Sequence, residues 1–157
     1  MKAVILGLLS AIPTIALAID PGAILGTWST EDRYGNRDSI VEIARNGEEY
    51  VGRVVWVKFD VYPENDPRGM AGQPLVDREN PDPELRDRPI LGIPIVSGLR
   101  FGENEWLGGR IYSPRQGTSY AAKAWLEDAD TLKVRGYIGS PFFGKTVTWR
   151  RAHVPKP

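Results

Sequence analysis

Four polar side chains lie within or beside apolar segments of this sequence, and their chemistry suits an anionic ligand. They are Arg86, Tyr112, Tyr120 and Arg135. An arginine guanidinium can bind a carboxylate through two parallel hydrogen bonds, and a tyrosine hydroxyl can add another. We interpret these four residues, with Trp56 as an apolar wall, as candidate ligand-binding residues. For Arg135 the alternative is an outer position, paired with an acidic residue of a loop.

A cluster of four carboxylates and one amide occupies residues 77–84. Oxygen ligands of this kind suit calcium, but the spacing lacks the glycine and the terminal glutamate of an EF-hand loop. Nearby arginines also compete for the same carboxylates. We therefore expect Asp77 and Asn80 to order a loop, and Asp82 to cap a short helix that begins at Pro83. No metal and no cofactor is expected.

The segment from Gly139 to Thr146 matches the phosphate-binding pattern G-x-x-x-x-G-K-[ST] letter for letter. That pattern needs a helix after the glycine loop, so that the helix N-terminus faces the phosphates. Here a strand-like run over residues 146–149 follows, and 11 residues remain after Thr146. We predict a turn between two strands and no nucleotide binding.

The residue types present restrict catalytic chemistry. The chain has no Cys and a single His, His153. Thiol nucleophiles, disulfides and thiolate zinc sites are thereby excluded, and histidine-based triads are disfavoured. An enzyme would have to use Tyr, Arg and carboxylates as acids and bases. No pair of these has a diagnostic spacing, so we expect a protein that is not an enzyme and keep such chemistry as the alternative.

The first 18 residues have the pattern of a secretory signal peptide. A basic residue at position 2 precedes an apolar run, and residues 16–18 form a small-x-small cleavage site. A membrane anchor is disfavoured, because Pro13 and Thr14 interrupt the run and an acidic residue follows it. We predict cleavage after Ala18 and a periplasmic or secreted monomer of residues 19–157. No nucleic-acid partner is expected there.

The elements that must position these side chains are strands. Eight segments rich in β-branched and aromatic residues alternate with turn signals. They cover residues 24–30, 38–45, 49–58, 92–101, 105–112, 118–127, 131–139 and 145–151. Apolar and polar residues alternate along several of them, as in half-buried antiparallel strands. We predict an all-β fold, a single antiparallel up-and-down barrel of about eight strands whose closure removes exposed edges. A membrane-spanning barrel is the alternative, and charged residues on many strands argue against it.

Residues 59–91 form a connection too long for a hairpin, and such loops are often functional. Residues 60–88 hold eight acidic and four basic side chains, a balance of −4, whereas residues 110–157 hold nine basic and three acidic ones, a balance of +6. The net charge of zero is therefore a cancellation between regions. We predict that this acidic loop docks on the basic wall of the C-terminal half and that their charges pair.

The first and last strands are neighbours in a closed barrel, and their residues suggest how the barrel closes. Gly26 and Trp28 lie in the first strand, and Trp149 and Arg151 lie in the last. A tryptophan ring can pack against the guanidinium plane of an arginine from the neighbouring strand. The Gly-x-Trp pattern is similar to the signature of lipocalin-like barrels, where it closes the base and does not contact ligand.

An ordered series of motifs runs through the chain. It consists of Gly26-x-Trp28, residues 52–56 (GRVVW), Asp77-x-x-Asn80-Pro-Asp82-Pro-x-Leu85-Arg86, Leu91-Gly92, Gly109-x-Ile111-Tyr112-x-Pro114, Gly117-x-x-Tyr120, residues 132–137 and Trp149-x-Arg151. The series resembles the bacterial family named domain of unknown function 2147, whose members are small exported proteins. The resemblance implies a lipocalin-like barrel and export but no activity. Members often carry Asp before the proline, where this chain has Ser113.

Two functions fit these features. A barrel of about eight strands can hold one small ligand, so the first is a periplasmic protein that binds a small apolar or anionic amphipathic molecule. The second is a structural or interaction protein of the cell envelope, which would use the acidic loop and the basic wall.

Overall fold

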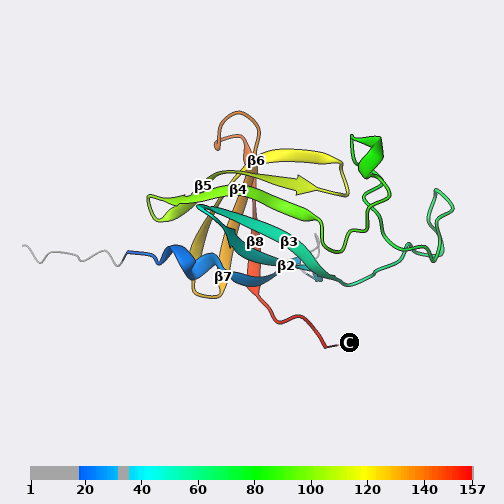
Figure 1. Cartoon of the computed structure of the whole chain (residues 1–157), viewed down its shortest axis with the longest axis horizontal. Coiled ribbons are helices and arrows are strands. Elements are labelled where there is room, and N and C mark those ends of the chain that lie inside the picture. Colours follow the sequence, from blue (N-terminus) through cyan, green and yellow to red (C-terminus); the bar gives the residue numbers. More distant parts are fainter. Residues whose placement is uncertain (1–17, 32–35, 157) are drawn as a thin grey trace, which may run out of the picture.

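The computed structural model describes residues 18–31 and 36–156, and in them eight strands close into one barrel (Figure 1). The strands are β1 (Gly26–Glu31), β2 (Arg37–Asn46), β3 (Glu49–Val57), β4 (Pro94–Gly102), β5 (Glu105–Ser113), β6 (Thr118–Asp128), β7 (Thr131–Tyr137) and β8 (Gly144–Arg151). Each pairs antiparallel with its neighbours in chain order, and β8 pairs with β1. The predicted all-β, lipocalin-like, up-and-down barrel is confirmed. The predicted signal peptide lies outside the described residues, apart from Ala18.

Alternation along the strands fills the barrel interior with apolar side chains. Between β6 and β7, for example, Ala124 faces Val134 and Leu126 faces Leu132. Residues opposite each other in an antiparallel pair point to the same side, so these layers face inward together. The largest buried side chains lie near the turns β2–β3, β4–β5 and β6–β7. They include Trp28, Tyr50, Leu99, Trp106, Leu132 and Trp149. This end of the barrel, the closed end, is therefore solid core.

A short 3-10 helix, η1 (Pro21–Ile24), covers the closed end. Asp20 caps it, with its Oδ1 accepting from the Gly22 amide at 2.8 Å. The Tyr50 hydroxyl donates to the Pro21 carbonyl at 2.9 Å. The predicted start of the first strand at Ile24 was wrong: β1 begins at Gly26, because Asp20 and Pro21 first start a helical turn that includes Ile24.

Arg151 of β8 contacts both β1 and η1 at the closed end of the barrel. Its guanidinium lies 3.8 Å from the centre of the Trp28 ring, and these two residues are register partners across the β1–β8 seam. The same group donates to the carbonyls of Ala23 and Leu25, so it ties β8 to η1. Gly26 has a φ of +106°, which favours glycine, and a Cβ there would lie 3.1 Å from Arg151 Nη1. Trp149 is buried beside this group, on the inner face of β8.

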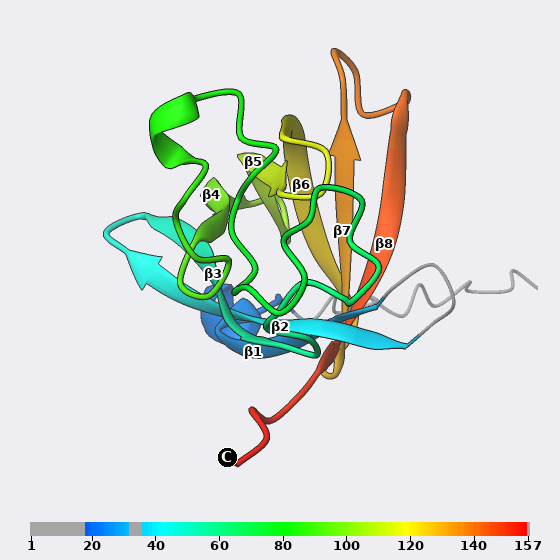
Figure 2. The same ribbon diagram turned by 90° about the vertical axis from the view of Figure 1, so that its right-hand side faces the viewer.

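The long β3–β4 connection, residues 58–93, projects beyond the other end of the barrel in Figure 1 and lies in front of that end in Figure 2. It holds η2 (Pro83–Leu85), where the Asp82 side chain accepts from the Glu84 amide at 3.0 Å, as the sequence predicted. Two isolated bridges, Val61 to Pro74 and Val76 to Pro89, fold the connection back on itself.

The charge pairing predicted for this acidic loop was wrong. Its ion pairs are internal, joining Arg78 to Asp66 at 2.8 Å, Arg68 to Glu79 at 2.9 Å and Arg88 to Asp77 at 2.8 Å. Among the described residues, no ion pair joins this loop to the C-terminal strands. The loop docks instead through a neutral hydroxyl, since Tyr112 of β5 donates to the Asp77 carboxylate.

Within the described ranges, no helix is long and apolar enough to cross a membrane.

Candidate functional site

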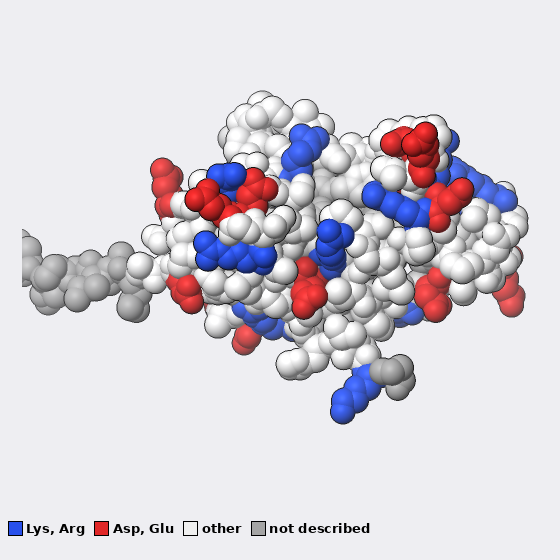
Figure 3. All heavy atoms as spheres, in the orientation of Figure 1, with Lys and Arg blue, Asp and Glu red and all other residues white. Residues whose placement is uncertain are grey.

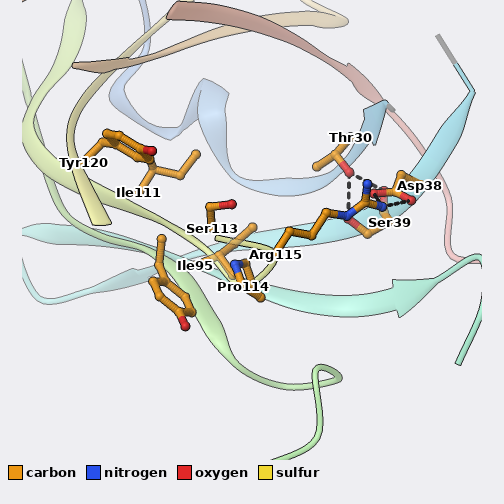
Figure 4. A pocket seen from close by; sticks show the side chains of 10 residues that line it. Thr30, Asp38, Ser39, Ile95, Ile111, Ser113, Pro114, Arg115 and Tyr120 are labelled. Carbon is orange, nitrogen blue, oxygen red and sulfur yellow. Dashed lines mark hydrogen bonds and ion pairs between the residues drawn. The ribbon is translucent and has the colours of Figure 1, made fainter. Parts of the chain in front are cut away.

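A cavity of about 260 Å³ opens at the mouth, the barrel end opposite η1 (Figure 4). Its lining mixes apolar side chains with hydroxyls from five strands and one turn. The lining residues are Thr30, Asp38, Ser39, Ile95, Ile111, Tyr112, Ser113, Pro114, Arg115 and Tyr120. These positions lie where β1 and β5 end and where β2, β4 and β6 begin. The closed end is filled by the core, so this cavity is the hollow part of the barrel.

An arginine bridges the mouth. Arg115, in the β5–β6 turn, donates to the Asp38 carboxylate of β2 at 2.7 and 2.8 Å (Figure 4). β2 and β5 are not neighbours in the barrel, so the contact spans the opening. The Arg115 side chain is 74% exposed, and the Asp38 side chain is 33% exposed. A pair this exposed is weak, so an incoming anion can compete for the arginine.

A second hollow, of about 570 Å³, adjoins the first. The two share Ser113, Arg115 and Tyr120 in their linings. The second extends to the β7–β8 hairpin, where it is lined by Gly136, Tyr137, Ile138, Phe143, Gly144 and Lys145. The mouth therefore has two adjoining hollows, with Arg115 and Lys145 as cations beside apolar surface.

The two candidate tyrosines face opposite sides of the wall. Tyr120 is the register partner of Ile111 and lines both hollows, and its hydroxyl donates to Gln116 Oε1 at 2.9 Å. Tyr112 is the next residue after Ile111, so its side chain leaves the other face of β5. Its hydroxyl donates to Asp77 Oδ1 at 2.6 Å. Tyr112 still borders the first cavity, but its hydroxyl is engaged by Asp77, so the two hydroxyls do not form one head-group site.

The Asp77 carboxylate is fully buried and anchors the long loop on the barrel. Tyr112 donates to Oδ1, and Oδ2 accepts from Asn80 Nδ2 at 2.7 Å and from Arg88 Nε and Nη2 at 3.0 and 2.8 Å. Asn80 also donates to the Tyr112 hydroxyl at 3.2 Å. A buried carboxylate needs such donors to replace lost hydration, so these four side chains hold the loop in one position.

This anchor also determines the protonation state of Tyr112. Burial, together with its hydrogen bond to the Asp77 carboxylate, raises the pKa of Tyr112 to about 12. The phenol therefore stays neutral at physiological pH and acts as a donor to the carboxylate. Asp77 is 0% exposed, so its carboxylate is satisfied by these donors rather than by solvent.

A second contact fixes the loop against the turn that carries Arg115. Gly117 has a φ of +62°, and a Cβ there would lie 1.8 Å from the Glu79 carbonyl oxygen. Only glycine permits this approach, because any side chain would overlap the loop backbone. The β5–β6 turn and the long loop are thus packed as one unit.

The remaining sequence candidates lie apart from one another. Arg86 follows η2 and donates from Nε to the Asn80 carbonyl at 2.8 Å. Arg135 holds the β7–β8 turn, donating to Pro141 O, Phe142 O and Thr146 Oγ1, so it pairs with no loop acid. Trp56 is half-buried on β3. Arg115 and Asp38 were not among the candidates, because they are 77 residues apart and lie in the turn after β5 and on β2, which are not neighbours in the barrel.

The described residues hold no cluster of three or more His, Cys, Asp or Glu side chains placed for a metal. At Asp77 the carboxylate oxygens already accept from Tyr112, Asn80 and Arg88. The phosphate-loop pattern forms a β-turn region between β7 and β8, and strand β8 begins at Gly144. The helix that phosphate binding requires is therefore replaced by a strand.

The comparisons with known proteins agree with this architecture. A family model described as an uncharacterized protein conserved in bacteria (DUF2147) matches residues 26–151. The chain belongs to this family. The match spans all eight strands and the long loop of the DUF2147 protein, so the resemblance in the ordered motifs is confirmed. No curated protein matches its sequence.

One solved structure is similar to the DUF2147 protein. It is described as protein HP1028 from the human pathogen Helicobacter pylori and as belonging to the lipocalin family. The two chains are 23% identical, 83% of each is covered, and the TM-score is 0.66. At this identity the likeness shows the fold alone.

Proposed function

We propose that this DUF2147 protein is exported and binds a small amphipathic ligand with an anionic head at the barrel mouth. The observation that carries the proposal is the cavity of about 260 Å³, lined by Ile95 and Ile111 and spanned by Arg115. Small eight-stranded barrels are suited to holding one small ligand. The family and the fold support a binding protein more than an enzyme.

The mouth suggests how such a ligand would lie. An anionic head would displace the Asp38 carboxylate from Arg115, because exposed ion pairs exchange at little cost. The tail would pack on Ile95 and Ile111 and extend past Tyr120 into the second hollow. The solid core at Trp28 and Trp106 limits its depth. Export rests on the signal-peptide pattern of residues 1–18.

Binding can be measured with the fluorescent anion anilinonaphthalene sulfonate, displaced by dodecanoate or by dodecanol. We expect both to displace the probe, with dodecanoate about three- to tenfold stronger because its head pairs with Arg115. Arg115→Ala should remove that difference. Arg100→Ala is the matched control, since Arg100 pairs with Glu48 and Glu49 at the closed end.

A second pair of variants tests the location. Ser113→Trp would fill the space shared by both hollows and should abolish displacement, whereas Ser97→Trp on the outer face of β4 should not. Native mass spectrometry of protein purified from the periplasm would then identify a retained ligand. The proposal would be contradicted if neither dodecanoate nor dodecanol displaced the probe, or if Ser113→Trp bound them as well as the wild type does.

The alternative function is an interaction protein of the cell envelope, and exposed apolar side chains support it better than the pairing of the acidic loop with a basic wall does. Arginines of the acidic loop pair with its own Asp66, Asp77 and Glu79, and three large exposed apolar side chains cluster on the β7–β8 hairpin.

A further inference from the structure

The turn between β7 and β8 presents three large apolar side chains to solvent. Ile138 is 71% exposed, Phe142 83% and Phe143 72%. In Figure 1 this turn projects beyond the barrel, and in Figure 3, drawn in the same orientation, the projection is white with a blue side chain at its flank. We call residues 138–143 the hairpin tip. Clustered exposure of this kind marks an interaction site more often than scattered apolar residues do.

Hydrogen bonds hold the hairpin tip in one shape. Arg135 donates from Nε to the Pro141 carbonyl at 2.6 Å and from Nη2 to the Phe142 carbonyl at 3.2 Å. The Phe143 amide donates to the Ser140 carbonyl at 2.9 Å. The two phenyl rings lie edge to face, with centroids 5.3 Å apart. The backbone that carries the two rings is thus held in place, which lowers the entropy lost when the tip contacts a partner.

Basic side chains lie at the base of the hairpin tip. Arg135 donates to the Pro141 and Phe142 carbonyls, and Lys145 is two residues beyond the tip in sequence. Arg115 lines the same hollow as Phe143 and Lys145. No ion pair of Lys145 or Arg135 occurs in the part of the chain that the structure describes. An apolar point with a cationic border is complementary to an anionic bilayer surface.

We propose that the hairpin tip docks on an anionic lipid bilayer, with Phe142 and Phe143 in the interface and Lys145 near the phosphates. Aromatic side chains favour this depth of a membrane, and basic side chains next to it bind anionic head groups. A protein partner fits less well, since a stable interface buries about 800 Å² on each side and the tip is a single projecting turn. The proposal does not depend on what occupies the cavity.

Docking is tested by co-sedimentation of the mature protein with vesicles of phosphatidylglycerol and phosphatidylcholine in equal parts, and with vesicles of phosphatidylcholine alone. We expect binding to the anionic vesicles that falls with added salt, and little binding to the neutral ones. Phe142→Ser should weaken binding several-fold, and Phe142→Ser with Phe143→Ser should weaken it at least about tenfold. Lys145→Gln should lower binding to the anionic vesicles only.

Phe59→Ser is the matched control, because Phe59 is 66% exposed but lies in the β3–β4 connection. It should bind vesicles as the wild type does. Phe142 lines neither hollow, so Phe142→Ser should retain probe binding at the mouth and separates docking from ligand capture. Both rings are exposed, and the variants should keep the wild-type melting temperature. Absence of vesicle binding, full binding by the double variant, or an equal loss with Phe59→Ser would each overturn the proposal.

Discussion

The Tyr112 hydroxyl donates to the buried Asp77 carboxylate at 2.6 Å, and this bond joins the barrel wall to the long loop. The two residues are 35 positions apart, on β5 and on the β3–β4 connection. Asp77 also accepts from Asn80 and Arg88, both on the loop. Tyr112 is thus the barrel's own contribution to the anchor.

Tyr112→Phe should destabilise the protein by about 1–3 kcal/mol. The change leaves a buried carboxylate with one donor fewer, which costs more than an ordinary hydrogen bond. Tyr120→Phe is the control, since its hydroxyl contacts only Gln116 among the hydrogen bonds described and should cost about 0.5 kcal/mol or less. Urea unfolding measures both, and equal losses would contradict the role of the anchor.

Alkaline stability follows from the same pair. An unfolded tyrosine ionises near pH 10, whereas burial and the Asp77 hydrogen bond raise the pKa of Tyr112 to about 12. Between these values the folded state keeps a proton that the unfolded state has lost, so stability falls as pH rises. Tyr112→Phe should lack this part of the loss. The urea midpoints of the wild type and of Tyr112→Phe should be compared from about pH 9 to about pH 12, a range that brackets the ordinary tyrosine pKa.

Asp66→Asn should loosen the outer part of the loop and leave the barrel unchanged. Arg78 donates to Asp66 Oδ1 at 2.8 Å, and the amides of Arg68 and Met70 donate to Oδ2. The Arg78 hydrogen bond, more than any other interaction, lowers the pKa of Asp66 from 3.8. Stability from this carboxylate is complete above that value and is lost as pH falls through the lowered pKa.

Hydrogen exchange separates the two regions. Residues 62–78 should exchange faster in Asp66→Asn, and in the wild type at acidic pH, while β5 to β7 stay protected. Glu64→Gln, a change at an exposed loop acid, is the control. Faster exchange throughout the barrel would show that the loop is not a separate unit.

Arg151→Lys should cost about 2 kcal/mol, because lysine cannot contact the Trp28 ring and several carbonyls with one planar group. Arg150→Lys on the same strand should cost about 0.5 kcal/mol or less, since the Arg150 side chain is 60% exposed. Thermal unfolding distinguishes them. Similar losses would mean that Arg151 acts only as a surface charge.

Calcium should not raise the melting temperature. The Asp77 oxygens already accept four hydrogen bonds from neighbouring side chains, and an ion would have to displace Arg88. A calorimetric scan with and without the ion tests this, and a rise of several degrees would contradict it.

The strands were predictable from the sequence because period-two alternation and turn residues are local signals. Helix η1 also had a local signal, since Asp20-Pro21 repeats the cap and proline of Asp82-Pro83, but the prediction began a strand at Ile24. The candidate site was harder to predict than the strands. Tyr112 and Tyr120 look equivalent in sequence, and only the register Ile111 to Tyr120 shows which one faces inward.

The contact between Arg115 and Asp38 could not be predicted. It joins β2 to the turn after β5, which are not neighbours in the barrel, and neither residue lies in an apolar segment that would single it out. The charge totals misled for a related reason: regional sums hide that Arg68, Arg78 and Arg88 are interleaved with the acids they neutralise.

The β1–β8 junction has two register pairs, Trp28 with Arg151 and Ser29 with Arg150, the fewest between any neighbouring strands described. Both pairs lie toward the closed end, so β8 from Gly144 to Trp149 has no β1 partner in the described part of the chain. The β1–β8 junction is therefore the weakest part of the barrel wall. Under thermal or applied stress β8 should separate from β1 first at its Gly144 end, while Trp28 and Arg151 still hold the other end. The hairpin tip would then move with β8.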